Sequence, residues 1–302
     1  MNRCLRLLLL SLITVSAFYL SLLTILSKNT LEDFDNYVEP RYQDERPNTN
    51  NDDDSSANAT SKARRYWEAV RWVREHLVEP SGDVHQVVLD ETKTDYSQAG
   101  QAMTLIQKYF KNKTDGRFIE VGAYDGEKYS NTLALELHYN WTGILIEAAV
   151  ENFNQLLQKN RNSYILHARI TNTTELTNSA FVARGSGAAA LNADNLTDGT
   201  MKKYGNMAAV VTTVPLGAVL QAVGWSRYDL ITIDVEGEEL QVLESIDSWQ
   251  SVQIDFFQIE CRYCNSLAAQ KLSRLRAFMH QHGYTEVDKL FVDRIFKNNS
   301  LP

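Results

Sequence analysis

From residue 117 onward, short apolar runs alternate with amphipathic segments. The runs RFIEV (117–121), GILIEA (143–148) and SYILHARI (163–170) are separated by helical patterns over 130–139 and 152–160. Short apolar runs between turns are typical of buried strands, and strands that alternate with helices pair into a mostly parallel sheet covered on both faces. We therefore expect an α/β fold whose ligand site lies at the carboxyl ends of the strands.

The alternation continues to the end of the chain. Further strands are predicted at 207–215, 229–237 and 252–260, helices at 216–224, 238–246 and 268–283, and a final antiparallel pair at 284–287 and 289–297. A stretch of polar and small residues, 185–200, interrupts the order. Upstream, a helical stripe is formed by Tyr66, Val70, Val73 and Leu77. A second helix is predicted over 98–110, with Ser97 as a candidate cap.

The first residues of the chain predict a membrane anchor. Residues 7–26 carry no charge, and twenty helical residues span roughly 30 Å, the thickness of a bilayer core. A cleaved signal peptide is the alternative, but the length of the run and its exit at 26–28 favour a retained anchor. Arg3 and Arg6 precede the run, which indicates a cytoplasmic tail (1–6) and a type II, single-pass topology.

The remaining chain divides into a stalk and a folded part. Residues 27–62 are polar and acidic, which predicts a disordered stalk, and residues 63–302 are expected to form a lumenal domain with its core over 95–297. The expected location is a membrane of the secretory pathway: endoplasmic reticulum, Golgi, endosome or plasma membrane. Glycosylation sequons agree with a lumenal domain and occur at Asn58, Asn112, Asn140, Asn172, Asn195 and Asn298.

The first strand of the domain runs into a glycine-containing loop, FIEVGAYDGE (118–127). Gly122 would let the backbone turn and approach a ligand, and the next strand ends in Glu147, which could accept hydrogen bonds from a ribose. The loop lacks a phosphate-binding ending, and its carboxylates suit the cation of S-adenosylmethionine (SAM). An ordinary turn with a surface glutamate is the alternative.

Four blocks carry a resemblance to a known family. They are FIEVGAYDGE, SNTLALE (130–136), NWTGILIEA (140–148) and DLITIDVEGEELQVLES (229–245). In this order they resemble the FkbM-type methyltransferase domain, and more narrowly its animal Star-like members, which are type II membrane proteins. The upstream SQAGQ (97–101) adds to this resemblance, which covers roughly residues 95–297.

The resemblance implies a class I SAM-methyltransferase (Rossmann-like) fold, a seven-stranded sheet with a reversed last pair. It also implies a cofactor loop of Glu120, Gly122, Ala123, Tyr124 and Gly126, with Ser130, Asn131 and Thr132 opening the next helix and Glu147 at the ribose. Tyr124 and Asp125 make this loop bulkier and more acidic than in bacterial relatives. Asp234 would end a strand beside the transferred methyl group, followed by Glu236 and Gly237.

Family members of this type methylate hydroxyl oxygens, often on sugars. A hydroxyl needs a base near neutral pH, and Asp234, Glu236 and His167 are the candidates. Alternatively, Asp234 and Glu236 cap the helix expected to begin at Gly237. Both could share a metal ion, but the sequence offers no further ligand, so no metal is predicted.

The three cysteines predict modifications rather than catalysis. Cys4, at the cytoplasmic edge of the apolar run, is a candidate for palmitoylation. Cys261 and Cys264 are disulfide candidates in an oxidising lumen, with free thiols as the second interpretation. Zinc ranks last, because His280 and His282 have the wrong spacing for a zinc site.

Two functions therefore compete. The first is a membrane-anchored SAM-dependent O-methyltransferase that acts on a hydroxyl or glycan. The second is a catalytically silent methyltransferase fold that acts in vesicle-mediated export of membrane cargo, such as growth-factor precursors, from the endoplasmic reticulum. Nucleic acid is not an expected partner, because the net charge is −8 and no basic patch is present.

Overall fold

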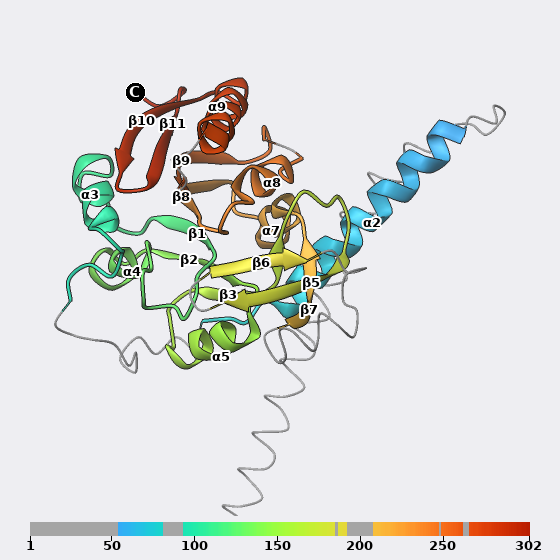
Figure 1. Cartoon of the computed structure of the whole chain (residues 1–302), viewed down its shortest axis with the longest axis horizontal. Coiled ribbons are helices and arrows are strands. Elements are labelled where there is room, and N and C mark those ends of the chain that lie inside the picture. Colours follow the sequence, from blue (N-terminus) through green and yellow to red (C-terminus); the bar gives the residue numbers. More distant parts are fainter. Residues whose placement is uncertain (1–53, 81–92, 185–186, 192–207, 248, 262–265) are drawn as a thin grey trace, which may run out of the picture. The chain divides into compact units, whose positions relative to one another are not determined.

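A seven-stranded sheet forms the centre of the computed structural model, which describes residues 54–80, 93–184, 187–191, 208–247, 249–261 and 266–302 (Figure 1). Its strands are β1 (Arg117–Val121), β2 (Thr142–Glu147), β3 (Tyr164–His167), β8 (Arg227–Ile233), β9 (Gln253–Glu260), β10 (Tyr284–Leu290) and β11 (Asp293–Asn298). Their order is β10-β11-β9-β8-β1-β2-β3. Strands β3, β2, β1, β8 and β9 pair in parallel, whereas β11 is antiparallel to both neighbours. The expected sheet with a reversed last pair is confirmed.

The sheet is buried on both faces because its strands are apolar almost throughout. Alternate residues supply two core clusters: Ile119, Ile144 and Ile231 belong to one, and Phe118 and Leu145 to the other. Side chains that alternate along a strand point to opposite faces, so each cluster covers one face.

Helices from different parts of the chain complete these two clusters. Residues of α2 (Asp54–His76), α7 (Leu216–Val223), α8 (Glu239–Glu244) and α9 (Ser266–Gln281) join the first. Residues of α3 (Gln101–Lys108), α4 (Leu133–Tyr139) and α5 (Val150–Gln158) join the second. Helices therefore cover both faces, as the alternation of elements predicts.

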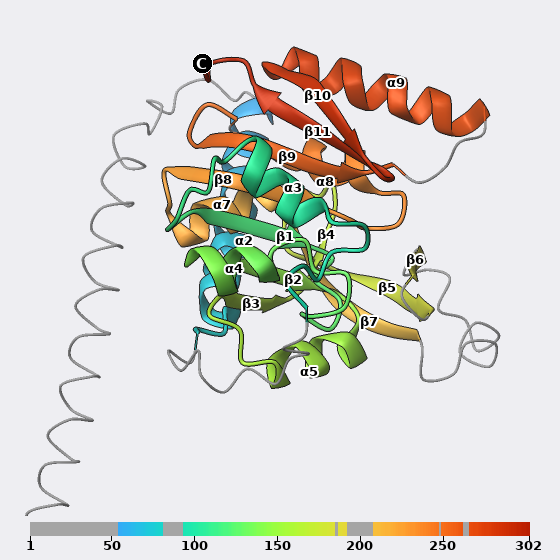
Figure 2. The same cartoon turned by 90° about the vertical axis from the view of Figure 1, so that its left-hand side faces the viewer.

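A second sheet was not expected from the sequence. It contains β4 (Arg169–Ile170), β5 (Thr177–Arg184), β6 (Gly187–Leu191) and β7 (Ala208–Val214) in the order β4-β7-β5-β6 (Figure 2). The run 163–170, predicted as one strand, divides at Ala168 into β3 and β4, which lie in different sheets. Strand β5 (TNSAFVAR) begins with three polar residues, and β6 (GAAAL) consists mainly of alanine, so neither has the run of bulky apolar residues that is typical of a buried strand. Pairing with β7 and with each other holds them extended.

Two helices begin at residues other than those expected. Helix α2 begins at Asp54, so residues 54–62, which the composition places in the stalk, are helical. These residues contain neither proline nor glycine. Once the later turns of α2 have formed, adding residues at its N-terminus costs little free energy, because each added residue gains a hydrogen bond. Helix α3 begins at Gln101 and Gly100, whose φ is +79°, occupies the N-cap position, so Ser97 lies three residues before it. The Ser97 hydroxyl nevertheless accepts a hydrogen bond from the Ala102 N–H in the first turn, as a capping side chain does.

The predicted anchor (7–26) and most of the predicted stalk lie outside the described residues. Among the helices that the structure describes, none is both long enough and apolar enough to cross a bilayer.

Candidate cofactor site

A cleft of ≈ 310 Å³ lies at the carboxyl edge of the central sheet. Most of the sequence-predicted site residues line it together: Glu120, Gly122, Ala123, Tyr124, Ser130, Asn131, Glu147, Asp234 and Glu236. Gly126, Thr132 and His167 are not among its lining residues. The register explains the convergence, because Val121 pairs with both Ile146 and Ile233 and the three strands therefore end side by side.

Gly122 brings the loop after β1 against the loop after β8. Its φ is +90°, and an added Cβ would overlap the main-chain oxygen of Asp234. The N–H groups of Gly122 and Ala123 both donate to Ile146 O, at 2.9 and 3.0 Å, and the Asp234 N–H donates to Val121 O at 3.0 Å. The loop is therefore tied to both neighbouring strands, and only glycine fits at position 122.

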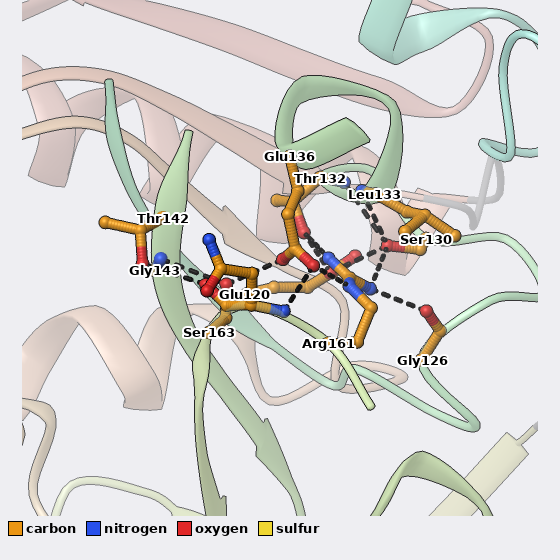
Figure 3. Close-up of polar contacts among 11 residues, drawn as sticks. Glu120, Gly126, Ser130, Thr132, Leu133, Glu136, Thr142, Gly143, Arg161 and Ser163 are labelled. Atoms are coloured by element: carbon orange, nitrogen blue, oxygen red, sulfur yellow. Dashed lines mark hydrogen bonds and ion pairs between the residues drawn. The ribbon is translucent and has the colours of Figure 1, made fainter. Parts of the chain in front are cut away.

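Glu120 is a buried carboxylate that organises the start of α4. It accepts hydrogen bonds from Ser130 Oγ at 2.9 Å and Thr132 Oγ1 at 2.5 Å (Figure 3). It also accepts one from the Asn131 N–H at 2.7 Å. Burial raises the pKa of Glu120, while the charge of Arg161 and these hydrogen bonds oppose the rise. The sequence predicts that Ser130, Asn131 and Thr132 lie near the cofactor loop. In the structure they have a second role, because their hydrogen bonds fix the position of the Glu120 carboxylate.

Sequence reasoning missed Arg161, which is fully buried behind the loop. Its guanidinium pairs with Glu136 at 3.0 Å and donates to Gly126 O at 2.5 Å and Thr132 Oγ1 at 3.2 Å (Figure 3). Glu136 also accepts from the Asn162 N–H and Ser163 Oγ, both at 2.7 Å. The polar stretch around Arg161 resembles an exposed turn, so no local signal indicates a buried arginine.

Gly126 serves the packing of the loop rather than the cleft. Its φ is +81°, and an added Cβ would overlap Leu156 Cδ1 on α5. Its carbonyl oxygen accepts the hydrogen bond from Arg161. Gly126 is therefore needed where the loop closes against α5.

Glu147 ends β2 and is 7% exposed. Its Oε2 accepts from the Tyr124 N–H at 2.9 Å, and its Oε1 accepts from the Ala149 N–H at 2.8 Å and Asn152 Nδ2 at 3.4 Å. Burial raises the pKa of Glu147 to about 7, although these hydrogen bonds work in the opposite direction. A carboxylate offers about four acceptor positions and three are used here, so Glu147 retains about one position for a ribose hydroxyl.

The candidate bases Asp234 and Glu236 lie in the turn after β8. Glu236 has a φ of +57° and Gly237 a φ of +114°. Helix α8 begins at Glu239, one residue after the start of the predicted range 238–246 and two after Gly237, and the Glu239 carboxylate accepts the Gly237 N–H at 2.7 Å. Glu260, at the end of β9, brings a third carboxylate, and single oxygens of Asp234, Glu236 and Glu260 lie within 4.8 Å of one another.

His167 is less suited to act as the base. Its ring stacks on Phe153 with centroids 4.6 Å apart, and its Nε2 lies 3.1 Å from Ala148 O. Burial lowers the pKa of His167. Because the His167 ring packs on Phe153 and His167 does not line the cleft, Asp234 and Glu236 are better placed to act as the base.

The cleft also presents buried polar atoms that make no hydrogen bond with any residue that the structure describes. Asn131 Oδ1 and Thr232 Oγ1 are such atoms, and both residues line the cleft. The Asn131 oxygen lies on the residue that donates its N–H to Glu120, so an amide oxygen and a carboxylate occur together there. This acceptor set fits the ammonium group of SAM, as Glu147 fits its ribose.

The predicted modification sites differ in accessibility. Asn112, Asn140 and Asn172 are exposed, whereas Asn298 Nδ2 donates to Ile254 O at 3.0 Å. The side chain of Asn58 and the whole of Asn195 lie outside what the structure describes. The same is true of Cys4 and Cys264, so the predicted palmitoylation and the Cys261–Cys264 disulfide stay predictions. His280 is exposed and the His282 ring stacks on Trp249 with centroids 4.3 Å apart.

Comparison with known proteins gives one family match. The model of the methyltransferase FkbM domain matches residues 120–286, more than half of the chain. The comparison with curated proteins found no match.

Several solved methyltransferase structures are similar to this chain. A precorrin-6y C5,15-methyltransferase from Geobacter metallireducens is 13% identical, with 72% of this chain and 96% of that chain covered and a TM-score of 0.37. The methyltransferase FkbM from Methylobacillus flagellatus is 11% identical (78% and 60% covered, TM-score 0.39). The SAM-bound fibrillarin from Aeropyrum pernix is 10% identical (66% and 72% covered, TM-score 0.37). The family assignment therefore rests on the domain match.

Proposed function

The chain belongs to the methyltransferase FkbM domain family, and from this premise we propose that it is an enzyme that transfers the methyl group of SAM to a hydroxyl oxygen. The domain is of the SAM-dependent methyltransferase type. The observation that carries the proposal is the joint position of Glu120 and Glu147 at the ends of adjacent parallel strands, on either side of the Gly122 turn. Both carboxylates line one cleft.

Different residues of the cleft would bind different groups of the cofactor. Glu147 would accept the ribose hydroxyls, and Glu120 with Asn131 Oδ1 would face the ammonium group. When bound, SAM supplies a methyl group activated by a sulfonium cation. Asp234, beside Gly122 in the same cleft, would take the proton from the acceptor hydroxyl, with Glu236 as the alternative base.

The test is SAM binding to the full-length chain, measured by calorimetry and thermal shift. A ligand at a hundred times its Kd stabilises a protein by about 2.7 kcal/mol. We expect measurable heat and a raised Tm, both lost in Glu147→Gln and kept in Glu151→Gln, whose carboxylate is exposed on α5. No heat and no shift at millimolar SAM would contradict the proposal.

The membrane setting is part of this proposal and rests on the sequence. A type II anchor is supported by the uncharged run 7–26 and by the two arginines before it. The six sequons support a lumenal domain, as in Star-like proteins. A glycan or another hydroxyl compound of the secretory pathway is then the substrate.

A second candidate is a silent methyltransferase fold that exports membrane cargo. One observation favours it: Glu120 and Glu147 already accept hydrogen bonds from the chain itself, so the loop keeps its shape without a cofactor. Glu147→Ala separates the two functions. It would abolish methyl transfer by an enzyme, whereas cargo export measured in cells would persist if the fold acts only as a binding module.

A further inference from the structure

A lysine and two tyrosines from one short segment lie on the wall of the cofactor cleft. Lys128 Nζ lies 5.8 Å from the centroid of the Tyr124 ring and 5.0 Å from the centroid of the Tyr129 ring. All three residues line the cleft. A cation within about 6 Å of a ring centroid is attracted to the ring, so the two tyrosines hold the ammonium group at the cleft.

The backbone of both tyrosines lies in the left-handed region. The φ angle is +53° at Tyr124 and +65° at Tyr129. Bulky residues rarely adopt this conformation, and it persists only where the surrounding structure fixes it. The Tyr124 N–H donates to Glu147 Oε2 at 2.9 Å, and Tyr129 pairs with Ser97 in an isolated β-bridge. Strain of this kind gathers at binding sites, and here it lies at the two residues whose rings flank Lys128.

Lys128 is a basic side chain of the cleft that can still accept an anionic ligand. Arg169, the other arginine or lysine among the described lining residues, pairs with Glu238 at 2.6 Å and donates to Ser179 Oγ at 3.1 Å. The Lys128 ammonium group makes no ion pair with any residue that the structure describes. It can therefore bind an anion without breaking a contact to a carboxylate of the described chain.

Exposure places this lysine at the outer part of the cleft. Tyr129 is 44% exposed and Lys128 is exposed as well. Glu120 and Asn131, which would face the ammonium group of SAM, are only 3% and 8% exposed. A cofactor bound at the buried residues leaves the outer wall to the acceptor, so Lys128 is placed to contact the acceptor.

We propose that Lys128, held between the rings of Tyr124 and Tyr129, binds an anionic group of the acceptor and so selects substrates that carry a negative charge near the methylated hydroxyl. This inference rests on the proposed function and adds the charge of the substrate. The carboxylates that line the cleft repel an anion, so the preference depends on this one cation, and removing its charge should abolish the preference.

The test uses the full-length chain, saturated with S-adenosylhomocysteine, and two pairs of probes that differ in charge but hardly in size. They are 4-hydroxyphenylacetate with its amide and glucuronate with glucuronamide. Ligand-observed NMR titration at pH 7 measures each Kd. We expect each acid to bind about fivefold more tightly than its amide, the upper range for an ion pair in contact with water. Lys128→Gln should remove this difference and leave the Kd of the amides unchanged, whereas Lys128→Arg should keep it.

Lys289→Gln is the matched control. Lys289 is exposed on β10 and is not among the residues that line the cleft, so this variant loses the same charge elsewhere. It should prefer the acids as the unmodified chain does. Calorimetry with S-adenosylhomocysteine and with 5′-methylthioadenosine, which lacks the amino-acid part of the cofactor, should give the same Kd for all variants.

Each outcome decides one claim. Equal binding of acid and amide by the unmodified chain, binding of neither, or a preference that survives in Lys128→Gln would overturn the proposal. If Lys128→Gln weakens S-adenosylhomocysteine but not 5′-methylthioadenosine, the lysine binds the carboxylate of the cofactor, which also overturns it. If S-adenosylhomocysteine does not bind the unmodified chain, the proposed methyl transfer is contradicted. A preference for the acids that requires Lys128 would then still show an anion site at the cleft.

Discussion

Arg161 reaches the Glu120 carboxylate through two shared hydroxyl groups. Thr132 Oγ1 accepts from Arg161 at 3.2 Å and donates to Glu120 at 2.5 Å, and Ser130 Oγ makes the same pair of contacts at 3.4 and 2.9 Å (Figure 3). An arginine can only donate, so both hydroxyl protons are directed to Glu120. The buried cation therefore orients the carboxylate that faces the cleft, although the two side chains do not touch.

Replacing Arg161 should destabilise the domain and weaken SAM binding. Arg161→Met leaves Glu136 buried without its charge partner, and breaking such a pair costs about 3–5 kcal/mol. Urea unfolding measures this loss, and calorimetry measures the Kd of SAM in the folded fraction. Arg276→Met is the control, because Arg276 pairs with Glu286 while half exposed and should cost less than about 1 kcal/mol. Equal losses in both variants would refute the positioning role.

Gly122 should not tolerate even a methyl group. In Gly122→Ala the positive φ is strained and the new Cβ overlaps the Asp234 carbonyl oxygen, which is backbone and cannot rotate away. Gly224→Ala shares the positive φ, but its Cβ would meet nothing within 4 Å. We expect Gly122→Ala to lower the free energy of unfolding by about 1–3 kcal/mol more than Gly224→Ala, measured by urea unfolding. Similar values would show that the close approach is unimportant.

Stability should fall with rising pH because of Glu147. Its pKa is raised from 4.5 to about 7 in the folded chain, so the folded state holds a proton that the unfolded state has lost between these values. The stabilising contribution is complete below about pH 4.5 and is lost as the pH rises through about 7, a change of about 3 kcal/mol.

Urea unfolding of the unmodified chain and of Glu147→Gln between pH 5 and 8 isolates this contribution. The difference between their free energies of unfolding removes the effect of Glu120 and Glu239, whose pKa values burial also raises. A difference that does not change with pH would contradict the raised pKa of Glu147. Binding of SAM should strengthen over the same range, because ribose hydroxyls donate to the ionised carboxylate.

Glycan occupancy should differ between two sequons. Asn112 is exposed at a turn with a φ of +59°, whereas the Asn298 amide donates to Ile254 O and lies 3.5 Å from the Tyr284 hydroxyl. After expression through the secretory pathway of animal cells, peptide mapping by mass spectrometry should find a glycan at Asn112 and little at Asn298. A glycan at neither position would contradict the lumenal orientation, and similar occupancy at both would contradict the argument from packing.

Much of the central sheet and of the cofactor loop could be predicted from the sequence. Strands β1, β2, β8 and β9 are local apolar runs, and parallel pairing brings their carboxyl ends to one edge whatever the packing details. Glu120, Gly122, Glu147 and Asp234 follow directly from those strand ends. The cleft position of these residues was therefore predictable, whereas the second sheet was not, since β5 and β6 depend on partners elsewhere in the chain.

The sequence by itself determined the order of strands and helices in the central sheet, the carboxylates at the strand ends and the glycine turn, because these depend on neighbouring residues and on the regular geometry of a sheet. Only the tertiary structure decided that Arg161 lies buried behind the loop and that Asp293 accepts hydrogen bonds from the side-chain amides of Gln101 and Gln258. Gln101 and Asp293 are 192 positions apart, and hydrogen bonds between such distant side chains exist only once the core has packed and removed water from around them.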